Sequence, residues 1–335
     1  MSSQSAVEYF IEDIEYHGRN ERTAEFYRRV LTEFESFVDE EFDKSPVEVD
    51  YRDCMAYVHE LRTTKGESTV ATYASYLNRF YTYLESVDRH DENPMSLVIE
   101  EMDESIDSDP QRRDVSLPEM QGFVAGIRHP LHRAIVVTLL KTGIRSGELC
   151  NLDLKDVNLS GVETAREPRP ALSGRPDSLY VPADHSYGER SGGEVRTASN
   201  KRKRSTTIPI DDELRRILVQ WLAIRPDPVS ETEPLFMGTV ENWGSRLTPN
   251  VVHHIVEGHA RDAGWYRTGG SAEENVTPHY FRHFFTTYLR DSIGDRGIVK
   301  YLRGDVGDDV IDTYTHDWGN RIRETYLNHI YTVTE

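Results

Sequence analysis

Long apolar runs and cysteines are both scarce in this sequence. No stretch of the 335 residues approaches the length of about 18 apolar residues that a membrane-spanning helix needs. The opening segment MSSQSAVEYF lacks the basic start and apolar core of a secretory signal. The two cysteines, Cys54 and Cys150, fall in segments that read as helices, which argues against a disulfide framework or a cysteine metal site. We therefore expect no membrane partner and a cytoplasmic location.

Lysine is scarce as well, with 7 Lys against 32 Arg, and the net charge is −19. This composition is typical of a halophile's cytoplasm, where surface carboxylates keep proteins hydrated. An acidic face for a partner is the alternative. The charge is uneven: residues 1–110 carry 27 acidic and 10 basic side chains, and residues 111–335 carry 31 and 29. The second part is nearly neutral, so a nucleic-acid partner is not excluded.

The first part of the chain is predicted to form a small helical bundle. Apolar residues recur at three- and four-residue spacing over 5–17, 21–42, 50–64 and 68–87. The segment 91–114 is acidic, polar and interrupted by prolines, which is typical of a linker. We therefore predict a helical domain over 1–90, a linker over 91–114 and a second domain over 115–335.

The second domain is predicted to be mostly helical around a small sheet. Ser116 and Glu119 form a capping box, and an apolar helix over 131–142 should stop at Gly143. Strands are expected at 152–159, in the SLYVPA piece of the insert 160–196, and at 205–210. A helix over 211–225 follows, and everything after Thr248 reads as helix. The fold class is thus mainly α with a small β-sheet: a helical bundle and an α+β domain.

Two patterns in the second domain place cations near chain turns. In TGIRSGEL (142–149), Arg145 should project from a helix N-terminus, where backbone N–H groups also favour an anion. By itself, an Arg with a nearby Glu is usually a solvated pair. The basic run Lys201-Arg202-Lys203-Arg204 precedes a strand, so Lys201 at a hairpin tip can donate a proton to a leaving oxygen. The run could equally be a loop that only grips phosphates.

Two further patterns lie towards the C-terminus. In His279-Tyr280-Phe281-Arg282, the first and last residues share one helix face and can clamp a phosphate. The segment Leu302-Arg303-Gly304-Asp305 is followed, nine residues after the aspartate, by Tyr314. Taken singly, an HxxR motif is common, and one tyrosine among 18 usually serves packing.

Together these patterns resemble the tyrosine recombinase (phage integrase) family, especially its Xer-like members. That family carries an Arg in TGxRxxEL, a Lys eight residues before the Pro of a strand, HxxR, a His or Trp in LGH, and a Tyr nine residues later. The matching residues here are Arg145, Lys201, His279, Arg282, Asp305 and Tyr314. The N-terminal part resembles the family's core-binding domain through Thr23 and Tyr27, Thr69 and Tyr73, and Asn93-Pro94. The acid-rich composition points to a haloarchaeal member.

The resemblance implies cleavage and rejoining of DNA through a 3′-phosphotyrosyl intermediate. Tyr314 would be the nucleophile, and Arg145 and Arg282 would hold the non-bridging oxygens of the phosphorane. His279 is the better candidate to take the tyrosine proton, and Lys201 to protonate the leaving oxygen. Arg202, Lys203 and Arg204 are predicted to contact the DNA. No cofactor or metal is expected, and His253, His254 and His259 are interpreted as helix surface. The partners would be a double-stranded DNA site and further copies of the chain, four on paired sites and one or two when free.

Asp305 departs from the family pattern, because an anion stands where a hydrogen-bond donor is usual. It could accept hydrogen bonds and orient neighbouring cations, which we favour, or be protonated and donate. The amphipathic segment after His316 should bury its apolar stripe, against a neighbouring protomer as the resemblance implies or against its own domain. A catalytically impaired DNA-binding accessory protein and a type IB topoisomerase remain alternative functions.

Overall fold

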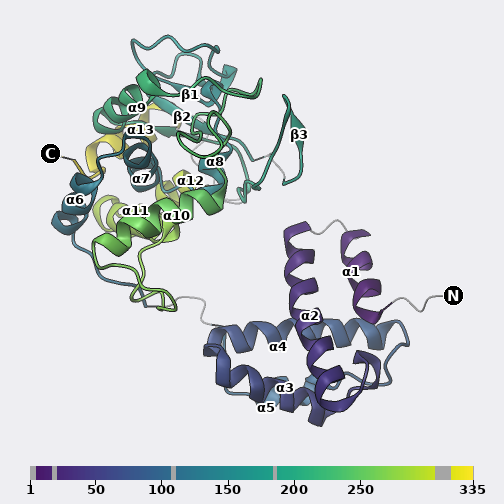
Figure 1. Cartoon of the computed structure of the whole chain (residues 1–335). Helices are drawn as coiled ribbons and strands as arrows, with labels where there is room; N and C mark the ends of the chain where they lie inside the picture. Colours follow the sequence, from purple (N-terminus) through teal and green to yellow (C-terminus); the bar gives the residue numbers. More distant parts are fainter. Residues whose placement is uncertain (1–4, 17–20, 107–110, 184–186, 306–317, 335) are drawn as a thin grey trace. The chain divides into compact units, whose positions relative to one another are not determined.

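The computed structural model describes residues 5–16, 21–106, 111–183, 187–305 and 318–334, and the chain divides into two compact units, Met1–Pro110 and Gln111–Glu335 (Figure 1). Helices dominate both units, and the second contains a small sheet, so the predicted fold class is confirmed. Within the described ranges, no helix is long and apolar enough to cross a membrane.

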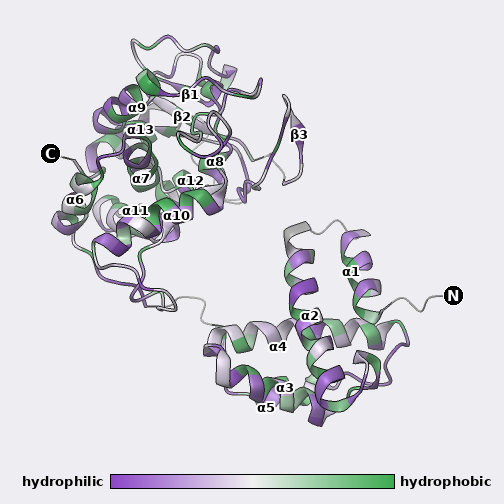
Figure 2. Ribbon diagram, in the orientation of Figure 1, coloured by the Kyte–Doolittle hydropathy of each residue, from purple (hydrophilic) through white to green (hydrophobic). Residues whose placement is uncertain are grey.

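The first unit is a helical bundle. It consists of α1 (Ala6–Tyr16), α2 (Glu21–Phe42), the 3-10 turn η1 (Pro46–Glu48), α3 (Tyr51–Thr64), α4 (Glu67–Ser86) and α5 (Met95–Glu101). Figure 2 shows these helices banded with hydrophilic and hydrophobic residues, as the three- and four-residue spacing predicts. Phe10 lies in the core, with its ring centroid 5.6 Å from that of Tyr27 and 5.4 Å from that of Phe80. The four predicted helices are confirmed.

Helix α5 lies inside the segment predicted as a linker. Its residues Met95 and Val98 are buried against α3 and α4. Asn93 ties it in place, because its Nδ2 donates to Asn78 Oδ1 at 2.8 Å and its Oδ1 accepts from Met95 N at 2.9 Å. The sequence missed this helix because seven residues are too few for a clear period and their neighbours are acidic. The helical unit therefore continues beyond residue 90, and the linker is shorter than predicted.

Helix α7 (Pro130–Thr142) runs through the middle of the second unit, with every residue from 134 to 142 buried. It contacts α6, α8, α9, α10 and α11. The helices around it are α6 (Leu117–Gly126), α8 (Ser146–Cys150), α9 (Asp212–Ile224), α10 (Pro249–Asp262), α11 (Pro278–Ile293), α12 (Arg296–Arg303) and α13 (Trp318–His329). The capping box of Ser116 and Glu119 and the helix stop at Gly143 are confirmed.

The sheet has three antiparallel strands in the order β1 (Val157–Asn158), β2 (Ser178–Val181) and β5 (Thr206–Pro209). Leu179 of β2 faces Val157 on one side and Ile208 on the other. A separate hairpin, β3 (Arg190–Ser191) and β4 (Glu194–Val195), occupies the insert between β2 and β5. The short 3-10 turn η3 (Pro170–Leu172) precedes β2.

Two predictions about secondary structure are wrong in part. Residues 152–159 form a strand only at Val157–Asn158, after the 3-10 turn η2 (Leu154–Asp156). The apolar-polar alternation arises there because the leucines face the core while the Asp156 carboxylate caps the turn, accepting from Asp153 N at 2.9 Å. The chain after Thr248 is not all helix either, since 263–277 joins α10 to α11 as turns and loop.

The C-terminal segment packs against its own domain. Tyr326 of α13 donates to the Lys141 carbonyl at 2.8 Å, and Tyr331 donates to the Leu140 carbonyl at 2.5 Å. Both rings are buried in the core of the second unit, with Val333 beside them. Most of the apolar stripe is therefore covered by its own domain, through Ile322, Tyr326 and Tyr331, whereas Leu327 stays exposed. This is the alternative to docking the whole stripe on a neighbouring protomer.

A buried lysine fastens this segment. The Lys141 side chain is 0% exposed, and its Nζ lies 2.7 Å from Asp211 Oδ2 and also contacts Glu213 Oε2 and the Tyr331 carbonyl. The Glu213 carboxylate in turn accepts from Val333 N at 3.1 Å. Three acceptors match the three donors of the ammonium group, which offsets its desolvation.

We predict that Lys141→Met destabilises the second unit by about 3–5 kcal/mol, because it leaves two carboxylates without their buried cation. Urea unfolding followed by tryptophan fluorescence measures this, and protease should remove the C-terminal residues faster from the variant. Lys300→Met is the control, because Lys300 is exposed and forms no ion pair with the residues that the structure describes. Equal unfolding midpoints for the two variants would contradict the prediction.

Candidate active site

Arg145 stands at the N-terminus of α8, immediately after a sharp turn. Gly143 has φ +61°, and a Cβ on it would lie 2.3 Å from Cδ1 of Phe285 in α11. Only glycine therefore lets α7 end this close to α11. The turn delivers the Arg145 guanidinium, 28% exposed, to a point where its Nη2 donates to Asp305 Oδ1 at 3.0 Å. The predicted position at a helix start is confirmed.

Arg282 comes from the first turns of α11 and is almost fully enclosed, with its side chain 2% exposed. Its Nη1 donates to the carbonyls of Gly143 at 2.7 Å and Arg303 at 3.0 Å. Its Nη2 donates to both carboxylate oxygens of Asp305, at 2.8 and 2.9 Å. One guanidinium thus joins the end of α7, the start of α11 and the end of α12.

Asp305 is the anion on which these cations converge. Besides Arg145 and Arg282, Arg303 places its Nε 2.9 Å from Asp305 Oδ2. The backbone supports this position, because Asp305 N donates to the Lys300 carbonyl at 3.0 Å just beyond α12. Three guanidiniums therefore share one carboxylate, and two of them, Arg145 and Arg303, are partly open to solvent.

The cluster is ionised at neutral pH. Burial pushes the pKa of Asp305 upwards, but the charges of Arg282, Arg303 and Arg145 outweigh it and hold that pKa below its usual value. Burial, and then the charge of Arg145, lower the pKa of Arg282 to about 10 in spite of Asp305. Asp305 is thus a hydrogen-bond acceptor that orients arginines, which agrees with the favoured interpretation and not with a protonated donor.

Glu148 is a site residue that the sequence interpretation missed. Its side chain is 0% exposed, and its carboxylate accepts from Arg145 N at 2.9 Å and Arg145 Nη1 at 3.1 Å. The pair is therefore enclosed and not the solvated pair that its spacing suggested. Arg202 Nη2 also donates to Glu148, at 3.3 Å. The three-residue spacing in TGIRSGEL was the signal that could have identified it.

Arg202 does not lie on the surface, where a DNA contact would need it. Its side chain is 0% exposed, and its Nη1 donates to the Leu302 carbonyl at 3.3 Å. A Cβ on Gly304 would lie 2.5 Å from Arg202 Cγ, so the glycine makes room for this side chain. The predicted DNA contact is not supported for Arg202, which instead fixes the basic loop to the end of α12.

Lys201 lies on this loop, beside the cluster. Its carbonyl accepts from Arg145 Nη1 at 3.2 Å, and its side chain is exposed. The loop runs from the β3–β4 hairpin to β5, so Lys201 is not at a hairpin tip as predicted. Lys203 is exposed and Arg204 is half-buried. The structure thus brings Lys201 near Arg145 and leaves its side chain exposed.

His279 opens α11, with Thr277 and Pro278 as the predicted cap and first residue. Its side chain is exposed, and Arg112, Arg145 and Arg282 lie near enough for their charges to act on it. Desolvation, followed by the charges of Arg112 and Arg282, lowers the pKa of His279 to about 4. The imidazole is therefore neutral at neutral pH and can accept a proton.

Tyr314, the predicted nucleophile, lies outside the described residues. Its nearest rivals in sequence are Tyr326 and Tyr331, whose hydroxyls donate to backbone carbonyls inside the core. Burial raises the pKa of both phenols well above the ordinary value. Neither can reach a DNA phosphate without unpacking the domain.

The histidines of α10 divide into two kinds. His254 is exposed and His253 is partly exposed, as expected for a helix surface. His259 is half-buried instead, with Nε2 3.0 Å from Nδ1 of His132. Among the residues that the structure describes, no group of three or more His, Cys, Asp and Glu side chains could hold a metal ion.

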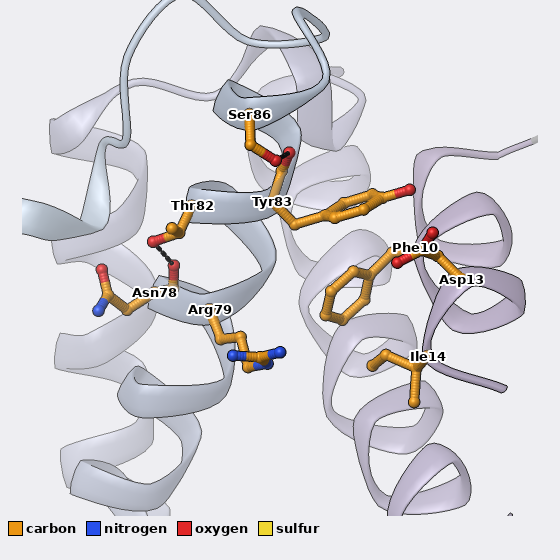
Figure 3. A pocket seen from close by; sticks show the side chains of 8 residues that line it. All are labelled: Phe10, Asp13, Ile14, Asn78, Arg79, Thr82, Tyr83 and Ser86. Atoms are coloured by element: carbon orange, nitrogen blue, oxygen red, sulfur yellow. Dashed lines mark hydrogen bonds between the residues drawn. The ribbon is translucent and has the colours of Figure 1, made fainter. Parts of the chain in front are cut away.

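The first unit has a hollow of about 780 Å³ between α1 and α4 (Figure 3). Its lining residues are Phe10, Asp13, Ile14, Asn78, Arg79, Thr82, Tyr83 and Ser86. Thr82 and Ser86 donate to backbone carbonyls of their own helix, at 2.8 and 2.7 Å. Desolvation, and then the charge of Asp13, raise the pKa of Tyr83 to about 12. Tyr83 is therefore poorly suited to act as a nucleophile, and the hollow lacks the clustered cations of the second unit.

Two family models match the chain. "Phage integrase, N-terminal SAM-like domain" covers residues 7–91, and "Phage integrase family" covers residues 189–320. The first match falls on the helical bundle. The second contains the basic loop, His279, Arg282 and Asp305, and the position of Tyr314.

Curated relatives are similar along nearly the whole chain. The tyrosine recombinase XerC of Pelobacter propionicus is 25% identical over 308 residues, which span 90% of this chain and 86% of that protein. XerC of Staphylococcus haemolyticus is 24% identical over 318 residues, with 91% and 90% covered. XerD of Oceanobacillus iheyensis is 22% identical over 348 residues, with 96% and 98% covered.

Solved integrases share the fold. The Tn1549 transposon integrase in complex with a circular intermediate DNA superposes with a TM-score of 0.66 at 16% identity, covering 98% of this chain and 96% of that one. A lambda integrase dimer bound to a core site gives 0.62 at 14% identity, with 91% and 95% covered. A lambda integrase tetramer bound to a Holliday junction gives 0.64 at 13% identity, with 91% and 77% covered. With both family models matched and the arginine cluster assembled, the chain belongs to the phage integrase family of tyrosine recombinases.

Proposed function

We propose that this protein is a site-specific recombinase that cleaves and rejoins double-stranded DNA, with Tyr314 as its nucleophile. The observation that carries the proposal is the convergence of Arg145 and Arg282 on one anion position beside a neutral His279. Paired guanidiniums match the non-bridging oxygens of a phosphodiester, and a neutral imidazole can take a proton.

In the cleavage step, the Tyr314 oxygen forms a bond to phosphorus and the bond from phosphorus to the 5′ oxygen breaks. The tyrosine loses its proton, for which His279 is the acceptor, and the departing oxygen gains one from Lys201. The phosphorane between these states carries an additional negative charge. Each preorganised cation at such a site is worth about 10²–10³ in rate. The phosphotyrosine conserves the bond energy, so rejoining by a DNA hydroxyl needs no nucleotide cofactor.

The contacts and exposure of these residues support the roles proposed for them. Arg282 is held by two carbonyls and a carboxylate, so it is set before any substrate arrives. Lys201 sits at the edge of the cluster on an exposed side chain, where a flexible stem can follow the leaving oxygen. The tyrosines at 326 and 331 are held in the core by hydrogen bonds to backbone carbonyls, which argues against either as the nucleophile.

We further propose a cytoplasmic protein that acts as a tetramer on two paired DNA sites and is a monomer or dimer when free. The similar lambda integrase structures include a dimer on a core site and a tetramer on a Holliday junction. Exchange of strands between two duplexes requires two cleavages on each, which four active sites supply. Crosslinking of the protein on a mapped site should yield four protomers for each pair of duplexes. Activity from a single protomer on a single duplex would instead favour a topoisomerase.

Tyr314→Phe is predicted to abolish the covalent adduct on a nicked substrate of the target sequence, while DNA affinity stays within about twofold because only one hydroxyl is lost. Denaturing gel electrophoresis of the trapped complex measures the adduct. Tyr326→Phe is the matched control and should still form it, since the lost hydroxyl only donates to the Lys141 carbonyl.

An adduct that survives in Tyr314→Phe and disappears in Tyr326→Phe would refute the nucleophile assignment. Trapping of the wild type on any duplex would favour a topoisomerase, and trapping on none would favour a catalytically impaired accessory protein.

The neutral state of His279 gives a second prediction. In the DNA-free protein, its imidazole should titrate near pH 4, well below the ordinary histidine value. Arg145→Ala should raise this pKa, because the charge of Arg145 contributes to lowering it. Histidine-selective NMR across pH 3.5 to 8 measures both values. A midpoint near 6.5 in the wild type would show that His279 lies outside the cationic environment.

A further inference from the structure

The segment 302–305 departs from the family pattern at two positions, 303 and 305, on either side of Gly304. Where the pattern has LGH, this chain has Arg303-Gly304-Asp305. Asp305 stands where the pattern has a hydrogen-bond donor, and Arg303 stands where the pattern has a leucine. The glycine between them has φ +72°, a left-handed conformation that turns the chain back. The turn brings the two new side chains together, with Arg303 Nε 2.9 Å from Asp305 Oδ2.

Arg303 has donor capacity that its neighbours leave unused. The contact of its Nε with Asp305 is ionic, and among the described residues this enclosed N–H has no hydrogen-bond acceptor. The side chain is 29% exposed, close to the 28% of Arg145 and far above the 2% of Arg282. Burial, and then the charge of Arg145, lower the pKa of Arg303. Arg303 and Arg145 thus present the accessible cationic groups of the cluster.

The charges give an independent reason for a third arginine. Arg202 and Glu148 neutralise each other in the interior. Of the groups around Asp305, three guanidiniums and one carboxylate leave two positive charges, and Lys201 at the edge of the cluster is assigned to the leaving oxygen. Without Arg303, the carboxylate would cancel half of the charge that Arg145 and Arg282 supply to the non-bridging oxygens of the phosphorane.

We propose that Arg303 is a third phosphate-binding guanidinium and that Asp305 is the residue that positions it, so that together they replace the donor of the family pattern. The inference rests on the proposed recombinase function. Asp305 touches no phosphate in this arrangement. It holds Arg145, Arg282 and Arg303 around one space through its two oxygens, and the DNA phosphate contacts the solvent-facing sides of Arg145 and Arg303.

The test measures single-turnover cleavage of a nicked target duplex by the full-length protein. Arg303→Leu should slow cleavage by about 100-fold or more, the loss expected for one preorganised contact to the transition state. Arg303→Lys should recover only part of this rate, since an ammonium group lacks the fork of donors. Arg261→Leu is the matched control, because Arg261 is 52% exposed, pairs with Glu257 on α10, and should have no effect.

Two further experiments distinguish a phosphate-binding role of Arg303 from a purely structural one. The double variant Arg303→Leu with Asp305→Asn removes the carboxylate charge but keeps an acceptor oxygen for Arg282, and it should cleave at least tenfold faster than Arg303→Leu alone. On a substrate whose scissile phosphate is a methylphosphonate, one negative charge is absent, so the difference between wild type and Arg303→Leu should shrink.

Cleavage by Arg303→Leu within threefold of the wild type would overturn the proposal. So would a slow variant that the double substitution does not rescue and whose defect is as large on methylphosphonate, because the arginine would then be structural. If the wild-type protein forms no adduct on any DNA, the proposed recombinase function is itself refuted, and the proposed role of Arg303 fails with it.

Discussion

The arrangement of the active site depends on one buried interaction, the pairing of Arg282 with Asp305. Arg282 arises on α11, and Asp305 follows α12, while the carbonyl of Gly143 at the end of α7 takes a third hydrogen bond. A guanidinium that is 2% exposed is costly to bury unless its donors are satisfied. These donors are satisfied only where the end of α7, the start of α11 and the end of α12 lie together. The same arrangement places Arg145 beside the Asp305 carboxylate. The position of the Arg145 guanidinium is thus a consequence of how the Arg282 guanidinium is stabilised.

The arginine cluster shows how a protein with a large negative net charge can still present cations locally. The chain as a whole carries −19, and most of that excess lies in residues 1–110. Charges spread over a surface act at long range and are screened by salt, whereas ion pairs inside a partly enclosed site are screened much less. In the cluster, three guanidiniums surround one carboxylate at contact distance. The overall charge therefore bears on solubility and on the approach of DNA, and the cluster bears on chemistry.

The C-terminal segment is also bound to α7, through Lys141. Lys141 lies two residues before Gly143 in α7, and its ammonium group is held by Asp211, Glu213 and the Tyr331 carbonyl. Release of the segment would leave these carboxylates and the lysine without part of their hydrogen bonds in an apolar core. The end of α7 is thus fixed by the tail on one side and by Arg282 on the other. A change in tail docking would act on the turn that delivers Arg145.

Much of this was accessible from the sequence by itself. The four long helices, the helix stop at Gly143 and the Thr277-Pro278 start of α11 follow from local periodicity and capping, which depend on neighbours along the chain. Arg145, Arg282 and Asp305 were identified through the resemblance of their motifs to the tyrosine recombinase family. The short α5 and the broken strand at 152–156 did not, because seven residues give no clear period and a turn can copy the alternation of a strand. Only the tertiary structure decided that Arg202 is enclosed, that Glu148 is buried, that the tail covers its own domain, and that Arg303 joins Asp305 in the site. Those outcomes depend on which side chains lose contact with water when distant segments pack, and burial of that kind is a property of the assembled fold, not of local sequence.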